Sequence, residues 1–230
     1  SLRERLSPEH WNAIVQCVQH FSQNCQHTTD KPEFSAIQAL HALDAASTSL
    51  AAITGAQTDR MTRDDGWQLL SIGRHVERLG FLSAALQLAV DVGSFDAQDN
   101  HTHFAALLAL FDSTITFQAQ HQQNRELMPL LDLLVHDNDN PRSLTWVARS
   151  LRARLSKLAD TPMGEPDALA KLVPNVQAWT LEQLCRSNDE GQLQLLSECL
   201  SACAQAAWQV SDAITARYFS HTDTADSVGV

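Results

Sequence analysis

Arg74, Glu77 and Arg78 are the residues whose types and spacing could do chemistry, and they lie in the stretch Thr62 to Val92. A helix advances about 100° per residue, so the three side chains share one arc of a helix with apolar residues such as Trp67. A buried charge without a partner is costly. We therefore expect Glu77 to pair with one arginine and to leave the donors of the other available.

Two interpretations of this charged group stay open. In the first, the three side chains form a buried ion network that fixes how helices cross. In the second, the spare arginine binds an anion, either a phosphate or a carboxylate such as a peptide terminus. Burial separates them, because an enclosed and fully bonded group favours the network, whereas a cleft with an arginine facing solvent favours a binding site.

Arg142 is a second candidate for anion binding. It follows Asn140 and Pro141, which we expect to cap and to open a helix, and the free amides of a helix start favour anions. A surface arginine beside a helix cap would look the same. His75 lies inside the charged stretch but points away from Arg74 on the helix, so we expect it at the edge of the core and not as a base.

Metal and catalytic motifs are weak in this sequence. The pairs His101/His103 and Asp132/His136 lack further partners at ligand spacing, and no glutamate is followed by histidine three residues later. We find no phosphate loop and no Gly-x-Ser-x-Gly elbow. We therefore expect no metal ligands, no cofactor and no catalytic residue.

The charged stretch itself predicts a long central helix over 62–92. A second apolar arc opposite the charged one implies neighbours on both sides, and it comprises Leu69, Ile72, Val76, Leu79, Leu86 and Val90. Gly73 and Gly80 lie on a third face, where another helix could approach closely.

Apolar periodicity and helix caps predict an all-α bundle of about seven to eight helices, with no strand. Six of the other expected helices cover residues 8–24, 101–121, 125–135, 141–158, 167–186 and 189–219, and the helix over 167–186 should kink at Pro174. A further helix should run from a cap at Asp30 to Gly55. The first would bury a stripe of Trp11, Ile14, Val15, Val18 and Phe21. We expect residues 1–221 to form a single domain and 222–230 to form a flexible tail.

Composition excludes several classes of protein. The formal net charge of −11 argues against a nucleic-acid partner. The longest apolar run, Phe104 to Phe111, falls short of the about 20 residues that span a membrane. Five cysteines without a Cys-x-x-Cys pair indicate free thiols in a reducing cytoplasm, with Cys199 and Cys203 as small buried residues.

Three stretches carry a resemblance to a known family. They are Gly73-Arg74-His75-Val76-Glu77-Arg78 after Met61 to Trp67, Asp139-Asn140-Pro141-Arg142-Ser143-Leu144, and Arg217-Tyr218-Phe219-Ser220-His221. In this order and spacing they resemble the alpha-E domain family of helical proteins, named for a Glu-Arg motif, across residues 1–221. Two features differ: the family's earlier Leu-Gly-Arg-x-x-Glu-Arg helix is missing, so we expect the chain to be incomplete at its N-terminus, and its aromatic and arginine-rich stretch is replaced by Thr116 to His121.

The resemblance implies a genomic context. Alpha-E proteins are typically encoded beside, or fused to, circularly permuted ATP-grasp ligases, and near transglutaminase-like peptidases. We therefore expect a non-catalytic bacterial module that assists or scaffolds an ATP-grasp peptide-ligase system, with Arg74, Glu77, Arg78 and Arg142 as an anion site or a structural network. The alternative is an enzyme of unknown reaction that uses Glu77 as acid or base in this pocket.

Overall fold

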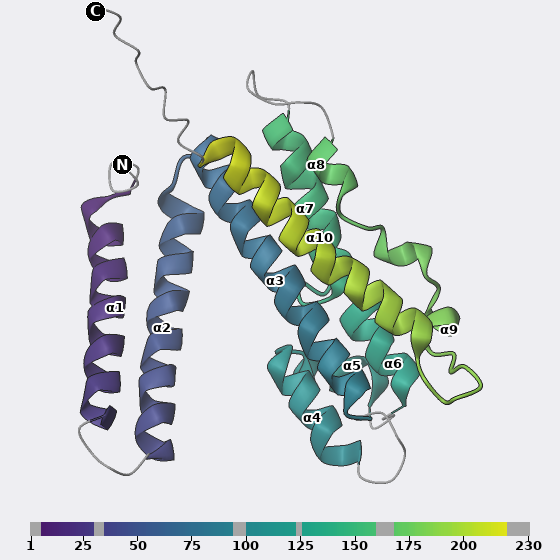
Figure 1. Ribbon diagram of the computed structural model, residues 1–230. Coiled ribbons are helices and arrows are strands. Elements are labelled where there is room, and N and C mark those ends of the chain that lie inside the picture. Colours follow the sequence, from purple (N-terminus) through teal and green to yellow (C-terminus); the bar gives the residue numbers. More distant parts are fainter. Residues whose placement is uncertain (1–5, 30–34, 94–99, 123–125, 160–167, 220–230) are drawn as a thin grey trace, which may run out of the picture. The chain divides into compact units, whose positions relative to one another are not determined.

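The computed structural model describes residues 6–29, 35–93, 100–122, 126–159 and 168–219. Over these ranges all regular structure is helical, in ten α-helices with one π-helical and one 3-10 segment (Figure 1). The all-α prediction is confirmed. The number exceeds the expected seven to eight because three of the helices, α6, α8 and α9, have only four or five residues each.

The chain divides into two compact units, Ser1–Gln68 and Leu69–Val230. Each unit is described by itself below. The single domain expected over 1–221 stays a prediction, and the tail 222–230 lies outside the described residues.

Unit 1 is built from two helices that pack on each other, α1 (Pro8–Thr29) and α2 (Ala36–Arg60). Serines cap both: Ser7 Oγ accepts from the His10 amide at 3.2 Å, and Ser35 Oγ accepts from the Gln38 amide at 3.4 Å. The capping box expected at 30–33 lies outside the described residues. Gly55 does not end α2, because a glycine inside a helix costs about 1 kcal/mol without breaking it.

The apolar stripe expected on α1 is only partly buried. Trp11, Ile14 and Val15 are half-buried, whereas Val18 is 61% and Phe21 is 40% exposed. The prediction is therefore wrong for these last two residues, since a pair of helices has too few neighbours to cover a full stripe.

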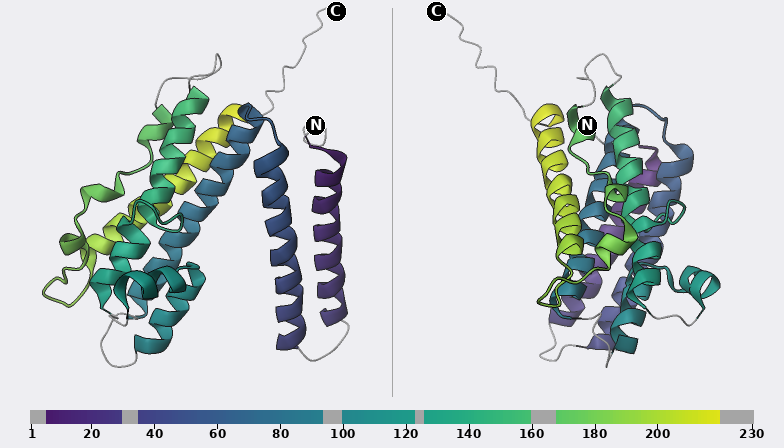
Figure 2. Two further views of the ribbon diagram at one scale, coloured as in Figure 1. Left: turned by 180° about the vertical axis from the view of Figure 1, so that it is seen from behind. Right: turned by 90° about the vertical axis from the view of Figure 1, so that its right-hand side faces the viewer.

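Unit 2 has one continuous apolar core, which α3 (Asp65–Asp91), α7 (Leu144–Ala159) and α10 (Gln194–Tyr218) share with the shorter helices. The two views of Figure 2 show α10 running alongside α3. At their contact a Cβ added to Gly80 would lie 3.6 Å from Ala207 Cβ, so the expected close approach is confirmed there. Gly73 has nothing within 4 Å, so the same expectation is wrong for Gly73.

The two apolar faces expected on α3 differ in the structure. The second arc is confirmed: Ile72, Leu79 and Leu86 are buried, and its other members pack against them. On the first arc Phe81 is 53% and Leu88 is 62% exposed. Within unit 2, α3 therefore packs through one broad face, and neighbours on its other side stay a prediction.

Two of the expected helices are interrupted. The helix expected over 101–121 divides into α4 (Asn100–Leu110) and α5 (Thr114–His121), because Asp112 between them adopts a left-handed backbone with φ of 49°. The helix expected over 167–186 is replaced by α8 (Ala168–Lys171), the 3-10 turn η3 (Val176–Ala178) and α9 (Leu181–Leu184). Pro174 ends a helix here and does not kink one, since the residue before a proline avoids the helical region.

The segment between α5 and α7 is also short. It holds α6 (Leu127–Leu131), which continues into the π-helical turn η2 (Asp132–His136). Four of its leucines, Leu130, Leu131, Leu133 and Leu134, are deeply buried, and the segment packs against α7 and α9. Across the described ranges no helix combines the length and apolarity that a membrane crossing needs.

Candidate functional site: an arginine cluster

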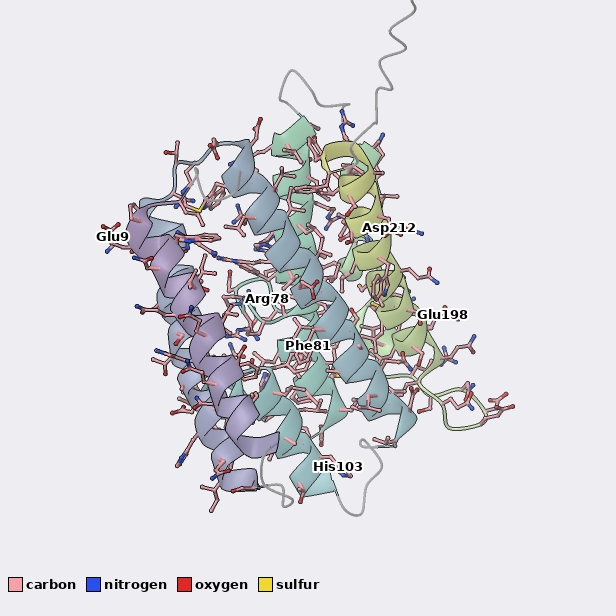
Figure 3. The ribbon with its side chains drawn as sticks, turned by 60° about the vertical axis from the view of Figure 1, so that its left-hand side comes forward. Glu9, Arg78, Phe81, His103, Glu198 and Asp212 are labelled. Carbon is pink, nitrogen blue, oxygen red and sulfur yellow. The ribbon has the colours of Figure 1, made fainter. Side chains whose placement is uncertain are left out.

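Three of the four charged residues singled out in the sequence lie close together in unit 2. Arg78 is a half-buried residue on α3, and Figure 3 shows it on the same side of this helix as Phe81. Burial lowers the pKa of Arg78, and the nearby positive charges of Arg142 and then Arg74 lower it further. We call Arg74, Arg78 and Arg142 the arginine cluster. It concentrates positive charge in a chain whose formal net charge is −11.

Asn140 fixes the turn that carries Arg142. Its Oδ1 accepts from the Arg142 amide at 3.0 Å, and its Nδ2 donates to the Leu133 carbonyl at 3.1 Å and to Ser113 Oγ at 3.4 Å. Asp137 Oδ1 closes the turn by accepting from the Asn140 amide at 3.2 Å. Asn140 is buried, with an exposure of 9%, so water does not compete for these hydrogen bonds. They therefore hold the backbone of Arg142 in one place.

Ser143, and not Asn140, caps α7. Its Oγ accepts from the Trp146 amide at 3.0 Å and donates to the Asp137 carbonyl. The expected helix start at Pro141 is therefore too early, and the helix begins at Leu144. The hydrogen bonds of Asn140 serve a turn before the helix, so Arg142 lies just outside its positive end.

Asp112 holds the guanidinium of Arg142. The Arg142 Nη2 atom donates to Asp112 Oδ2 at 3.3 Å, and the side chains of the two residues are 40% and 79% exposed. The left-handed turn at Asp112 that separates α4 from α5 places this carboxylate beside Arg142. The ion pair is open to solvent, so it orients Arg142 more than it stabilises the fold.

Glu77 is not enclosed as the sequence predicts. Glu77 and Arg74 are exposed, and among the described residues no ion pair joins Glu77 to Arg78. Arg78 likewise pairs with no carboxylate of the described residues. Adjacent helix residues diverge by about 100°, so Arg78 turns toward Arg142 while Glu77 turns to solvent. The prediction that these side chains are buried is therefore wrong for Arg74 and Glu77, while the ion network stays a prediction.

His75, on α3 between Arg74 and Arg78, is buried, with an exposure of 5%. Its Nδ1 lies 2.7 Å from the Ser71 carbonyl, which can only accept, so the proton is on Nδ1 and Nε2 carries a lone pair. Burial lowers the pKa of His75 to about 4, and the positive charges of Arg154, Arg78 and Arg74 act in the same direction. The imidazole is therefore neutral at pH 7. It is buried, and not at the edge of the core as expected.

Trp146 and Asp112 belong to this site and were missed in the sequence. Trp146 stacks on His75, with ring centroids 5.8 Å apart and planes 22° apart. The Asn140 to Ser143 stretch could have indicated Trp146, since a residue one turn into the following helix faces the same way as the cap. No signal in the sequence predicts the left-handed backbone of Asp112.

The rest of the described structure offers little other chemistry. No three His, Cys, Asp or Glu residues of the described ranges gather as a metal site requires. A recess beside α4 and α5 is lined by Phe104, Leu108, Phe117 and neutral polar side chains, so it contains no group for acid or base work. The residues of the arginine cluster provide no nucleophile.

The comparisons with known proteins give the family. Residues 1–219 match the Alpha-E family, described as a predicted alpha-helical domain with a conserved ER motif. The chain belongs to this family. Uncharacterized proteins of Mycobacterium bovis and of two strains of Mycobacterium tuberculosis are each 24% identical to it over 221 residues. The match covers 94% of this chain and 24% of each relative, so the chain spans about a quarter of their length. No solved structure matches the chain.

Proposed function

We propose that this chain is a non-catalytic helical module that assists or scaffolds a circularly permuted ATP-grasp peptide-ligase system in the bacterial cytoplasm. It acts by docking on the ligase or on its substrate. The partner is a fused or neighbouring ATP-grasp protein, and a transglutaminase-like peptidase is a second partner of the same system.

Membership of the Alpha-E family carries this proposal. The match to a quarter of much longer relatives fits a module that works beside other parts. The arginine cluster supports docking, because arginine side chains that reach solvent at a fixed place can recognise a negative group on a partner.

The alternative function is an enzyme that uses Glu77 as acid or base in an Arg/Glu pocket. The exposure of Glu77 does not favour it, because a catalytic carboxylate is usually enclosed beside the group it protonates. We therefore keep the module as the proposed function.

The test is co-purification from the native host, followed by an assay of ATP consumption with and without this chain. We expect an ATP-grasp protein to co-purify and its ATP consumption to depend on the chain, while the chain alone consumes none. Arg78→Leu should weaken the association. Turnover by the chain alone, abolished by Glu77→Gln while the fold is unchanged, would establish the enzyme instead.

A further inference from the structure

We propose that the recess between α4 and α5 binds an uncharged aromatic amide, that is, a planar ring with an amide group beside it. An aromatic residue of a peptide and a free ring carboxamide share this chemistry. The described residues that line the recess include none of the arginine cluster, and the inference goes beyond the docking function.

Two residues with a left-handed backbone bound the helix on one side of the recess. Asp112, with φ of 49°, turns the chain from α4 into α5, and Gln122, with φ of 54°, ends α5. The two helices stay in contact across this turn. The recess that both of them line has a volume of about 370 Å³, within the range of about 300 to 1,000 Å³ that is usual for small-ligand sites. It is therefore large enough for one ring and its substituents.

The floor of the recess is aromatic and apolar. Phe104 and Leu108 from α4 and Phe117 from α5 line it, and all three are buried. The rings of Phe104 and Phe117 meet edge to face, with centroids 5.2 Å apart and planes 74° apart, and Phe117 also contacts the ring of His121 at 5.1 Å. These contacts hold the two phenyl rings in place. A further ring can pack on them edge to face or offset, which are the arrangements that aromatic rings prefer.

The rim of the recess carries hydrogen-bonding side chains. Thr114, Gln118 and Gln122 line the recess, are exposed, and follow one another at intervals of four residues. In a helix this spacing places them in a row on one side, about 6 Å apart along the axis. A glutamine amide both donates and accepts, so the row can pair with the N–H and the C=O of an amide on the ligand. The rim thus suits an amide, as the floor suits a ring.

The charge of the chain favours an uncharged ligand. The formal net charge of −11 repels anions, and the glutamine and threonine side chains of the rim carry no charge that could hold one. An aromatic amide needs neither a cation nor an anion at the site. An aromatic carboxylate of the same size should therefore bind more weakly.

NMR titration of the whole chain with N-acetylphenylalaninamide and with benzamide tests the proposal. N-acetylglycinamide keeps the amides and lacks the ring, and sodium benzoate keeps the ring and replaces the amide by a charge. Ala105→Trp fills the recess from its exposed rim, and its matched control is Ala106→Trp, at the next exposed residue of α4, which does not line the recess. Gln118→Leu removes one amide of the row, and Gln120→Leu, on the exposed surface of α5, is its control.

We expect saturable binding of both aromatic amides, and the tighter of the two tells whether the source is a peptide residue or a free ring amide. Ala105→Trp should weaken the binding about tenfold or more, because the indole occupies the recess. Gln118→Leu should weaken it about threefold or more, because a hydrogen bond is lost and not replaced. The two control variants should bind like the wild type, and N-acetylglycinamide and benzoate should bind at least about tenfold more weakly than the aromatic amides.

Three results would overturn the inference. They are an absence of binding by both aromatic amides, a control variant that loses as much as its partner variant, and binding of N-acetylglycinamide or benzoate as tight as that of the aromatic amides. Circular dichroism checks that each variant is folded, and the exposed Gln118 keeps the test valid if Ala105→Trp folds poorly. Because no ligase is present, failure of this test leaves the docking proposal standing. Failure to co-purify a ligase leaves the recess proposal standing.

Discussion

Asn140 is the residue on which the position of Arg142 depends most. Asn140→Ala removes bonds to the Arg142 amide, the Leu133 carbonyl and Ser113 Oγ in a buried place. We expect the free energy of unfolding to fall by about 1 to 3 kcal/mol, measured by urea denaturation. The matched control is Asn175→Ala, whose side chain is exposed and makes no cap bond, and which should change stability little. Equal losses in the two variants would contradict the role of Asn140.

His75 gives the stability of unit 2 a pH dependence. Its pKa is about 4 in the fold against an ordinary value of 6.5, so between these values the unfolded chain binds a proton that the folded chain does not. Stability should therefore fall as pH decreases from 6.5 to 4, and this contribution should be complete above 6.5. NMR titration of the ring and urea denaturation across this range measure both effects.

The comparison for His75 is a pair of variants. His75→Phe should flatten the stability curve over this range, because the titrating group is gone while the stack on Trp146 is kept. His103→Gln on α4 changes an exposed histidine and should leave the slope as in the wild type. An unchanged slope in His75→Phe would show that other groups cause the acid sensitivity.

At the scale of elements, Gly80 sets how closely α3 and α10 pack. A Cβ at Gly80 would make ordinary contact with Ala207 at 3.6 Å, and an alanine inside a helix is favoured over glycine by about 1 kcal/mol. Gly80→Ala should therefore stabilise the chain slightly. Gly80→Leu should destabilise it by about 1 to 3 kcal/mol, because it forces the helices apart.

Gly73 is the control for this contact. Nothing lies within 4 Å of its added Cβ, so Gly73→Ala and Gly73→Leu should both stabilise the chain, by about 0.5 to 1 kcal/mol. Thermal or urea unfolding measures all four variants. A loss of stability in Gly73→Leu as large as that in Gly80→Leu would contradict the difference between the two faces.

Long elements could be predicted from the sequence, and short ones could not. The helices α3 and α10 show apolar repeats over many turns, which only a helix satisfies. The break at Asp112 depends on one left-handed residue that has no typical sequence, and α8, η3 and α9 are too short to show a period. The sequence pattern also predicted that Gly55 ends a helix, whereas Gly55 lies inside α2.

The members of the candidate site could be predicted in part. Arg74, Arg78 and Arg142 were found from charge within an apolar pattern and from the Asn-Pro-Arg-Ser turn. The arrangement of these residues in space could not be predicted, because the helical periodicity treats all residues of one arc as equally buried. Glu77 shows the limit: its arc is exposed in part, so the carboxylate has no need of a partner.

At the scale of the whole molecule, net charge governs which polymers can bind. With 27 acidic and 16 basic residues, the chain should not bind duplex DNA or RNA at physiological salt, even though three arginines gather on it. Fluorescence anisotropy with labelled duplexes measures this, with a basic DNA-binding protein as positive control. Tight, salt-dependent binding would show that the local field of the arginine cluster outweighs the overall charge.

Cys199 and Cys203 are one turn apart on α10 and are buried in the core, as the sequence predicts, while Cys25 is exposed. Both thiols are free, and a hydrogen bond with Cys199, together with burial, raises the pKa of Cys203 and keeps it protonated. Alkylating reagents reach thiolates, so these two sulfurs should stay unlabelled until α10 leaves the core. The rate at which iodoacetamide modifies Cys199 and Cys203 should therefore report how often unit 2 unfolds far enough to expose α10.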